Sequence, residues 1–591
     1  MKLKTQGIRR CAIFLFFDKD GIVDDYIPHM IRELHKSVEY VLVVSNGYVN
    51  LEGMQKLYSA ADEVFGRVNI GLDVGGYREG LFYIGFKKLA EYDELVLLNY
   101  TFFGPLYPFE EMFRAMQDRD LDFWGITKHH KVDPDPFGKL PYGYLPSHLQ
   151  SFFLVLRSSL FLSYQYKDFI FNMENPKTYL DSILGYEAIF TKHFEDMGFR
   201  WEAYVNTDEY EGYAYCPNMF YIEELLKEKR CPIIKRRSFF TDYSDFLLNS
   251  CGEVSVVAFE YLRDKLDYPE DEIWDNLLRL ENMSDIHRDL HLNYVLPEKG
   301  TLFTPEKQKT AIFLLAEWSG RAEWYRRFLK KLPEWLDIYV VGDRECDCAK
   351  VCALLENRDC RMIGLATEDF RAVLNQVAEM VQLDKYDYVG ILTMRNLERE
   401  KPYSNDVSWQ YSDWKNLLAS EDYIRNLLEV FEQNKRLGML IPPIPDYGRM
   451  FADRQDGWWG KYRQVSEWLK KYEIYVSLRQ NAAPLAPIGG SFWLRGKALT
   501  AASKSCNGEE PPARDELLLA MPFLMQNTGF YTGTVYSSQY ASIAATNKDY
   551  MFRENNKVVF QKYGSNYHTV CVSNIKKDAL MKKGYSESTS E

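Results

Sequence analysis

No uninterrupted run of about 18 apolar residues, the length that a membrane-spanning helix needs, occurs in the 591-residue sequence. The first residues also lack the apolar segment and cleavage site of a secretory signal. We therefore expect a cytoplasmic protein. Basic stretches near both ends, "MKLKTQGIRR" and "IKKDALMKKGY", suit either a peripheral contact with the inner face of the cell membrane or ordinary solvated charge.

Excess positive charge and regularly spaced cysteine are missing as well. The chain has 72 Lys and Arg against 85 Asp and Glu, which gives a formal net charge of -13. Because nucleic-acid binding needs a dense basic field, this balance argues against nucleic acid as the main partner. The ten cysteines show no regular spacing, which indicates reduced thiols in a reducing compartment.

The sequence does have ample material for hydrophobic cores. Hydrophobic residues make up 46% of the chain and aromatic residues 15%, which is typical of a folded globular protein. A chain of 591 residues is longer than one core normally serves, so we expect at least two domains. Aromatic side chains fill cores and also stack on sugars.

Short apolar runs alternate with helical patterns over the first 130 residues. The runs "CAIFLFF" (11–17), "VEYVLVVS" (38–45) and "ELVLLN" (94–99) have the length of strands, and the segments between them have helical periodicity. This alternation predicts βαβ units and a mainly parallel sheet. Ligands of such sheets bind at the carboxyl ends of the strands, which here are Asp18, Ser45–Gly47 and Asn99–Thr101.

A second strand-rich series follows a helical, acidic stretch. It contains "TAIFLLAEW", "LDIYVVGD" and "YDYVGILTM", and the segment "YDELVLLN" of the first half resembles "YDYVGILT" of the second. We therefore predict two α/β domains of similar type. The predicted boundaries are an N-terminal domain at 1–250, a helical linker at 251–305, a second domain at 306–550, and a C-terminal extension and tail at 551–591.

One candidate site lies at the end of the first strand. Asp18 and Asp20 in "FFDKDG" resemble the D-x-D-G motif of haloacid-dehalogenase-like phosphohydrolases, which use one Asp as nucleophile and the second as acid or base. The same letters also fit a structural turn. A phosphohydrolase that uses Asp18 and Asp20 is therefore kept as an alternative.

A second candidate site favours sugar transfer. The segment from Arg67 to Asp73 is a polar turn that contains glycine and leads into a helix predicted to start near Arg78, so its backbone N–H groups and Arg67 suit a nucleotide. An ordinary loop and helix cap fits equally well.

Glu187 is the candidate general base. It begins the amphipathic segment "GYEAIFTKHFEDMGF", which resembles the E-D-x-x-L-x-x-R segment of family 2, GT-A-fold glycosyltransferases, although Ala188 replaces the Asp. An inverting transfer needs one carboxylate near the acceptor hydroxyl and positive charge near the departing diphosphate. A glutamate that only stabilises the helix macrodipole fits the same pattern.

The order of many unusual blocks extends the resemblance to the whole chain. "RVNIGLDVGGYREGL", "YDELVLLNYTFFGPLYPFEEMF", "DFWGITKHH", "LPSHLQSFFLVLRSSLF" and "CPIIKRRSFF", followed by "GGSFWLRGKAL" and "DELLLAMPFLMQNTGFY", are similar to the rhamnan synthesis protein F family of bacterial rhamnosyltransferases. The resemblance implies two GT-A-like domains, with mainly parallel sheets, joined by a helical segment. It also implies inverting transfer of L-rhamnose from dTDP-L-rhamnose to a growing, lipid-linked cell-wall or surface polysaccharide.

The same resemblance implies a set of site residues in the first domain. Arg67, Asn69 and Asp73 belong to the donor pocket, and the basic triplet Lys235, Arg236 and Arg237 neutralises a diphosphate or lipid phosphate, unless it is simply a solvated loop. The sugar pocket is assigned to residues that follow two later strands: Trp124, Lys128, His129, His148 and Gln150.

The segment Asn99-Tyr100-Thr101 departs from the family pattern. Many relatives have an Asp where this chain has Tyr100, so a requirement for Mg²⁺ or Mn²⁺ is not supported and we expect weak or no metal dependence. Asn99 and Thr101 still offer hydrogen bonds to a sugar or phosphate.

The second domain offers Thr393, Arg395 and Glu516, the last a second candidate base, at comparable places. It either adds a second linkage or is a degenerate partner that binds acceptor. A non-catalytic carbohydrate-binding scaffold is the remaining alternative for the chain as a whole.

Overall fold

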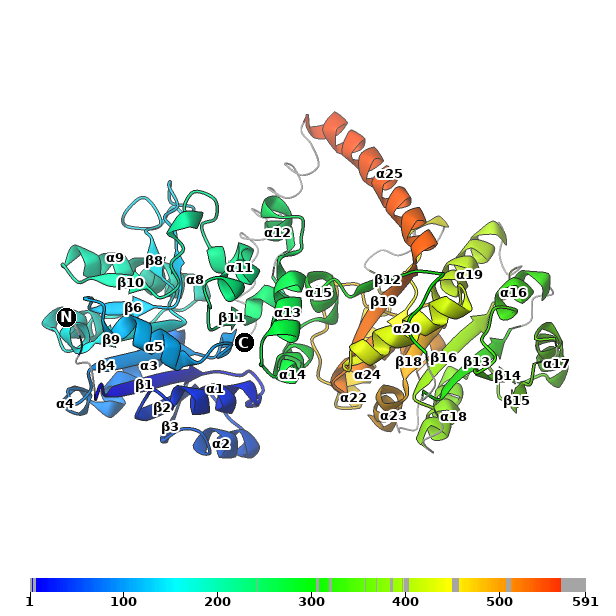
Figure 1. Cartoon of the computed structure of the whole chain (residues 1–591), viewed down its shortest axis with the longest axis horizontal. Coiled ribbons are helices and arrows are strands. Elements are labelled where there is room, and N and C mark those ends of the chain that lie inside the picture. The colour runs from blue at the N-terminus through cyan, green and yellow to red at the C-terminus, as the bar shows by residue number, and fades with distance from the viewer. Residues whose placement is uncertain are drawn as a thin grey trace. The chain divides into compact units, whose positions relative to one another are not determined.

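The structure is a computed structural model. It describes residue 3 and residues 7–564, apart from 242, 305–307, 318–321, 357, 368, 383–385, 396, 398–402, 449–456 and 506–511. Contacts divide the chain into two compact units, residues 1–277 and 278–591 (Figure 1). Each unit is a sheet with helices packed on it, and each is described by itself.

A seven-stranded sheet forms the centre of the first unit. Its strand order is β10-β6-β9-β4-β1-β2-β3, and all neighbours pair in parallel except β9, which is antiparallel to β4 and β6. The central strands are fully buried because their side chains are apolar on both faces. The strands are β1 (Arg10–Phe16), β2 (Tyr40–Asn46), β3 (Glu63–Arg67), β4 (Glu94–Asn99), β6 (Phe123–Gly125), β9 (Phe153–Arg157) and β10 (Trp201–Ala203).

The helices of the first unit mostly connect successive strands. Short strand pairs, β5 (Phe102–Phe103) with β11 (Ile234–Lys235) and β7 (Lys128–His129) with β8 (His148–Leu149), lie beside the main sheet. The helices are α1 (Tyr26–Leu34), α2 (Leu51–Tyr58), α3 (Leu72–Ile84), α4 (Phe86–Leu89), α5 (Phe109–Gln117), α6 (Ser158–Phe161), α7 (Tyr164–Phe171), α8 (Tyr179–Ser182), α9 (Ala188–Asp196), α10 (Pro217–Phe220), α11 (Ile222–Lys227), α12 (Tyr243–Asn249), α13 (Val254–Lys265) and α14 (Glu270–Leu280).

A buried charge network fixes the central strands of this sheet. Glu94 on β4 pairs with Arg157 on β9, and both side chains are at most 1% exposed. The same carboxylate accepts hydrogen bonds from Arg10 Nε at 2.7 Å and from Trp124 Nε1 at 3.3 Å. Arg157 also donates to three backbone carbonyl oxygens, so the pair has the hydrogen bonds that a buried ion pair needs.

An eight-stranded sheet forms the centre of the second unit. Its order is β12-β19-β17-β18-β16-β13-β14-β15, and β18 is antiparallel to both of its neighbours. The strands are β12 (Asn293–Leu296), β13 (Thr310–Ala316), β14 (Asp337–Gly342), β15 (Arg361–Gly364), β16 (Tyr388–Met394), β17 (Leu437–Ile441), β18 (Phe492–Arg495) and β19 (Tyr531–Ser537). The helices are α15 (Met283–Asp289), α16 (Ala322–Leu329), α17 (Glu345–Leu354), α18 (Phe370–Gln382), α19 (Tyr403–Leu417), α20 (Glu421–Gln433), α22 (Tyr462–Lys471), α23 (Gly496–Ser505), α24 (Arg514–Asn527) and α25 (Ser538–Tyr563).

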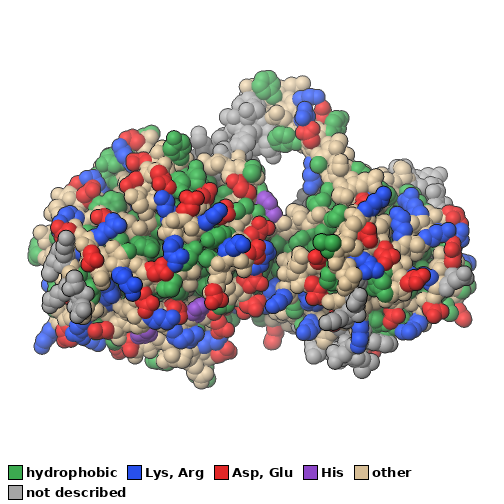
Figure 2. Space-filling model, viewed as in Figure 1, with side chains coloured by type: hydrophobic (Ala, Val, Ile, Leu, Met, Phe, Trp, Pro, Cys, Tyr) green, Lys and Arg blue, Asp and Glu red, His purple; other side chains and the backbone are tan. Residues whose placement is uncertain are grey.

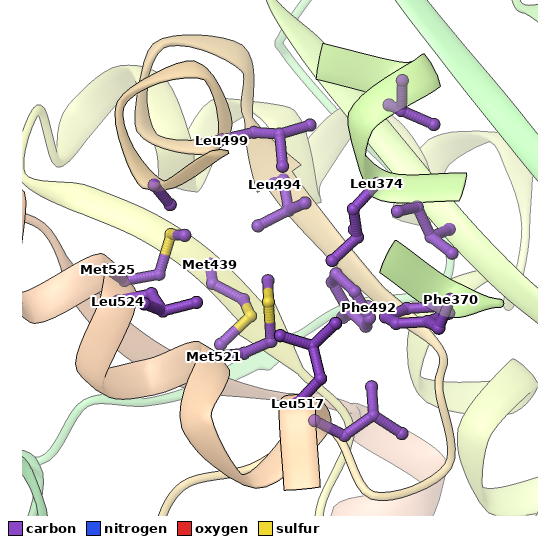
Figure 3. Packing of buried hydrophobic residues seen from close by; sticks show 14 of the residues in the cluster. Phe370, Leu374, Met439, Phe492, Leu494, Leu499, Leu517, Met521, Leu524 and Met525 are labelled. Atoms are coloured by element: carbon purple, nitrogen blue, oxygen red, sulfur yellow. The ribbon is translucent and has the colours of Figure 1, made fainter. Parts of the chain in front are cut away.

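The second core lies between this sheet and the helices α18, α23 and α24. Figure 3 shows Leu517 and Met521 of α24 pointing toward Phe492 of β18 and Met439 of β17. On the surface, acidic and basic side chains are interspersed over the visible face of each unit (Figure 2). None of the described helices is both long and apolar enough to cross a bilayer.

The two sheets share one topology. When β12 at the edge of the second sheet is left out and the seven other strands of each main sheet are numbered by their order in the sequence, both sheets have the order 3-2-1-4-6-5-7, with the sixth strand antiparallel. Glu94 lies opposite Arg157 in the first sheet, and Tyr388 lies opposite Arg495 in the second. The predicted class of two α/β domains with mainly parallel sheets is confirmed.

The predicted domain boundaries stay predictions. The stretch 251–305 holds α13, α14 and α15, and the division between the two units falls within α14. Much of the predicted stretch 551–591 lies outside the described residues, and its beginning belongs to α25.

Candidate active site

Helix α3 carries Asp73 to the carboxyl edge of the first sheet. The helix begins at Leu72 and not near Arg78 as predicted, because Gly71 and Leu72 adopt positive φ angles of 78° and 51° that turn the chain directly into it. Gly76 lets the helix approach β1 closely, since a Cβ there would lie 2.1 Å from Leu15 Cδ1. Asp73 therefore stands in the first turn, above the ends of the strands.

The end of β4 forms a hydrogen-bonded chain with Asp73. Asn99 Nδ2 donates to Asp73 Oδ2 at 2.8 Å, and Asn99 Oδ1 accepts from Thr101 N at 3.1 Å and Thr101 Oγ1 at 2.7 Å. Lys235 Nζ in turn donates to Thr101 Oγ1 at 3.4 Å and lies 3.9 Å from the centre of the Phe152 ring. Antiparallel pairing of β11 with β5 brings Lys235 here, 134 residues beyond Thr101 in the sequence.

Burial shifts the pKa values of Asp73 and Lys235, the two charged groups of this hydrogen-bonded cluster. It raises the pKa of Asp73 to about 6, against the hydrogen bond from Asn99, while Glu187 raises it further and Lys235 lowers it. It lowers the pKa of Lys235 to about 8, and the negative charges of Glu187 and Asp73 oppose this. At neutral pH Asp73 is therefore mostly ionised and Lys235 mostly protonated.

Glu187 lies on a π-helical segment, Ile183–Glu187, that runs directly into α9. Single π turns are frequent at functional sites. Ser151 holds the carboxylate with two hydrogen bonds to Oε2, one from its backbone N–H at 3.1 Å and one from its hydroxyl. Glu187 is thus oriented from the start of β9, and the interpretation of it as a helix-end charge alone does not account for this contact.

Asp73 and Glu187 line one cavity of about 70 Å³ that is partly open to the surface. Tyr77 and Tyr166 also line it, and among the described residues their buried hydroxyl groups have no hydrogen-bond partner. An unsatisfied buried hydroxyl costs about 1–3 kcal/mol, so a ligand with hydroxyl groups would be favoured here. The remaining wall is mostly apolar, with Leu97, Leu149, Leu154, Phe169, Ile170 and Phe190 among its residues.

Two predicted histidines stack close to this cluster. The rings of His129 and His148 lie 5.1 Å apart at 10°. Burial lowers the pKa of both, to about 4 for His129, while the charge of Glu187 acts in the opposite direction on each. Both are therefore neutral at pH 7, and each Nδ1 donates to a backbone carbonyl oxygen at 2.7 Å, which leaves the lone pair on Nε2.

Other predicted residues are used by the protein itself. Trp124 is fully buried and donates to Glu94, and Lys128 forms an ion pair with Asp208. Gln150 accepts hydrogen bonds from Thr127 Oγ1 at 2.6 Å and from Asn218 Nδ2 at 2.8 Å.

The predicted donor-binding turn is also largely occupied. Arg67 donates to Asn46, to the carbonyl oxygen of Ile70 and to Glu79, and its side chain is 3% exposed. These contacts hold the loop between β3 and α3 in shape. Asn69 keeps a buried Oδ1 without a partner among the described residues. Of this turn, Asp73 reaches the cluster around Glu187.

The basic triplet points in three directions. Lys235 faces the cluster, Arg236 is buried and donates to Asn276 Oδ1 at 2.7 Å, and Arg237 is exposed near Tyr179. The directions differ because Lys235 has an extended backbone, whereas Arg236 and Arg237 begin a 3-10 turn, Arg236–Phe239. Neither the solvated-loop interpretation nor the interpretation as a joint phosphate clamp describes all three residues.

Tyr100 and Asp18 lie next to each other in space. The Tyr100 ring contacts Phe16 at 6.2 Å and Phe17 at 6.4 Å between centroids, and burial raises its pKa, to which the charges of Asp73 and Asp18 add. Asp18 Oδ1 accepts from the backbone N–H groups of Asp20 and Ile22, as a loop cap does. Asp20 is exposed, so the two carboxylates of the phosphohydrolase alternative do not face one pocket.

A different set of charges occupies the same edge of the second sheet. Arg395 lies 3.6 Å from the Trp409 ring centre, and burial raises the pKa of the neighbouring Asp413 to about 7 while Arg395 lowers it. Arg514 donates to Thr393 Oγ1 at 3.1 Å and pairs with Glu317. The sequence pointed to Thr393 and Arg395. It did not point to Trp409, Asp413, Arg514 or Glu317, because no short motif marks these four residues.

The predicted second base, Glu516, does not belong to that set. Its Oε2 accepts from the backbone N–H of Ala513 at 3.3 Å, which caps α24, and its Oε1 lies 3.3 Å from Lys461 Nζ. Among the residues that the structure describes, no three or more His, Cys, Asp or Glu are placed to hold a metal ion.

These features define a class: a two-domain α/β protein with carboxylates and a lysine gathered at the carboxyl edge of its first, mainly parallel sheet. The chain belongs to the rhamnan synthesis protein F family, whose model matches residues 41–511. A protein of Sinorhizobium fredii (strain NBRC 101917 / NGR234), described as uncharacterized protein y4gN, is 28% identical over 193 residues. The match covers 32% of this chain and 46% of that relative, so it spans less than half of the relative's length.

Solved structures resemble the chain only weakly. The glycosyltransferase GlyE of Streptococcus pneumoniae TIGR4 matches at 12% identity over 68% of this chain and 90% of its own, with a TM-score of 0.23. A CMP:2-keto-3-deoxy-manno-octonic acid synthetase in complex with CTP matches at 13% identity over 33% of this chain and 88% of its own, with a TM-score of 0.22. Scores of this size do not establish an activity.

Proposed function

We propose that this protein is a glycosyltransferase that moves L-rhamnose from dTDP-L-rhamnose to a growing, lipid-linked polysaccharide, with inversion, at the site of its first unit. The family supports synthesis of a rhamnose polymer. The observation that carries the choice of site is the pair of carboxylates, Asp73 and Glu187, on one cavity with Lys235 held nearby by Thr101.

Glu187 acts as the general base in this proposal. Its carboxylate takes the proton of the acceptor hydroxyl as that oxygen attacks the anomeric carbon of the donor, and the bond to the nucleotide diphosphate breaks on the opposite face. Ser151 fixes one oxygen of Glu187, which orients the other. The transferred proton ends on Glu187 and the electron pair leaves with the diphosphate.

Lys235 stabilises the departing diphosphate. It is protonated at neutral pH and stands at the strand edge where ligands of such sheets bind. Asp73, with Asn99 as its hydrogen-bond donor, accepts hydrogen bonds from hydroxyl groups of the donor sugar or ribose. His129 and His148 lie close enough to interact electrostatically with Glu187 and, being neutral, add no charge there.

Thermal shift with a panel of sugar nucleotides tests the donor. A ligand that binds the folded state raises the apparent stability by RT ln(1 + [L]/Kd), so dTDP-L-rhamnose should raise Tm more than UDP-glucose, GDP-mannose or dTDP alone. Stabilisation by another sugar nucleotide instead would identify that nucleotide as the donor. The Lys235→Met variant should weaken the shift, and the Glu187→Gln variant should keep it.

Inactivating the two candidate bases separately tests which unit transfers. Glu187→Gln should lower the rate of transfer by about 10²–10⁴-fold. Glu516→Gln should leave transfer unchanged, because Glu516 caps its own helix and contacts Lys461. Loss of all transfer with Glu516→Gln alone would move the reaction to the second unit. Transfer that survives both substitutions would favour a carbohydrate-binding scaffold.

A further inference from the structure

A second hollow lies on the first unit, between α7 and the helical stretch that contains Glu187. Its volume is about 480 Å³, within the range of about 300–1,000 Å³ that small-molecule sites have. Its walls come from Tyr164 to Glu174 on one side and from Tyr186 to Met197 on the other. We call it the α7–α9 groove.

The groove adjoins the cavity of the candidate active site. Phe169, Met173 and Tyr186 line both. Tyr186 is also the neighbour of Glu187 in the sequence, and the π-helical segment that holds both places Glu187 on the cavity and Tyr186 between the cavity and the groove. The hydroxyl group of Tyr186 donates to the backbone carbonyl oxygen of Glu174, which closes the two walls of the groove at this end. A chain bound in the groove therefore has its end next to the candidate base.

The charge of the groove decides which ligands it suits. Its ten lining residues, all within the described part of the chain, include the carboxylates Asp168 and Glu174 and no lysine or arginine. Burial lowers the pKa of His193, so this side chain is neutral at pH 7. The charged side chains on these walls are carboxylates, and this disfavours a phosphate, a nucleotide or an anionic membrane surface as the ligand.

The remaining side chains are those that recognise sugars. Tyr164 is 79% exposed, so its ring is available for stacking on the apolar face of a sugar. Gln165 and Asn172 provide amide groups, and Asp168 already accepts from Asn172 Nδ2 at 3.0 Å. Carboxylates and amides beside an exposed aromatic ring can bind the hydroxyl groups and the C–H face of one saccharide together.

We propose that the α7–α9 groove binds an uncharged oligosaccharide stretch of the acceptor and holds its terminal sugar beside Glu187. This inference rests on the proposed function, because it takes the first unit as the site of transfer. The groove then confers a preference for acceptors several sugars long, and the lipid phosphate of the acceptor lies outside it.

The test measures binding of a rhamnose hexasaccharide and of cellohexaose to the full chain by saturation-transfer NMR and calorimetry. Removing stacking and an amide with the double variant Tyr164→Ala, Asn172→Ala should weaken binding at least tenfold. Tyr213→Ala is the matched control, because Tyr213 is 82% exposed and does not line the groove. Inorganic pyrophosphate should not compete with either oligosaccharide.

The possible results separate this inference from the proposed donor. If neither hexasaccharide binds, or if binding is equal in wild type and double variant, or if pyrophosphate competes, the groove is not the acceptor site. If only cellohexaose binds and the double variant no longer binds it, the groove is still the acceptor site, but the acceptor sugar is not rhamnose. A normal thermal shift with dTDP-L-rhamnose in the double variant shows that any loss belongs to the acceptor side.

Discussion

Replacing Asp73 by Asn should stabilise the protein at neutral pH while it removes transfer activity. Burial raises the pKa of this carboxyl from 3.8 to about 6, so the folded state holds the proton more tightly than the unfolded chain does. The pKa difference corresponds to roughly 3 kcal/mol of free energy, at about 1.36 kcal/mol per pKa unit. The ionised carboxylate therefore weakens the folded state above pH 6.

The sign follows from proton binding. Between about pH 4 and pH 6 the folded state binds more protons than the unfolded state, so the free energy of unfolding falls as pH rises through this window. Asn resembles the protonated carboxyl in shape, and its oxygen can still accept the hydrogen bond from Asn99. Some of the gain is offset because Lys235 loses one of its negative neighbours. We expect a stabilisation of about 1–3 kcal/mol at pH 7.5 and almost none at pH 4.

The assay is denaturant unfolding at both pH values. The quantity compared is the midpoint of the transition that belongs to the first unit, because a two-domain chain need not unfold in one step. Asp181→Asn is the control of opposite sign. The carboxylate of Asp181 accepts hydrogen bonds from the side chain and from the backbone N–H of Thr178, which lower its pKa, so this substitution should destabilise at pH 7.5. An Asp73→Asn variant that is no more stable than wild type at pH 7.5, or whose effect is the same at both pH values, would refute the reasoning.

Three further predictions concern single side chains. Glu187→Gln should lower kcat by about 10²–10⁴-fold with little change in the unfolding midpoint, because the amide oxygen still accepts from Ser151, and a steady-state transfer assay checks this. Glu94→Ala should destabilise the first unit by about 3–5 kcal/mol in urea unfolding, because it leaves Arg157 buried without its partner; a cost under 1 kcal/mol would contradict the network. Tyr100→Asp should make thermal stability depend on Mn²⁺, because it adds a carboxylate close to Asp18 and Asp73, and an unchanged Tm with Mn²⁺ would count against that arrangement.

The sequence predicted the strands that are most apolar and missed those that are not. The runs at 11–17, 38–45 and 94–99 correspond to β1, β2 and β4 within two residues at each end. Strand β3, "EVFGR", was not predicted, because it lies at the sheet edge and its side chains are only partly buried. The start of α3 was placed six residues late, because the positive φ of Leu72 has no reliable sequence signal.

For the site, the sequence predicted the types of residue better than the directions in which their side chains point. The triplet Lys235-Arg236-Arg237 is uniform in charge, yet the structure separates it into one residue at the cluster, one in a buried hydrogen bond and one in solvent. Trp124 has the aromatic character of a sugar-stacking residue, but the pairing of β6 with β9 places it in the core.

What the sequence by itself determined is the class: two α/β domains with mainly parallel sheets, the strand ends at which a ligand binds, and the family, because apolar periodicity and the order of blocks are properties of the chain alone. Only the tertiary structure decided which polar residues meet. Asp73, Asn99, Glu187 and Lys235 lie up to 162 positions apart in the sequence, and strand pairing and the close packing of α3 on β1 bring them to one edge. Burial at that edge then gives Asp73 and Lys235 their shifted pKa values, which no local pattern encodes.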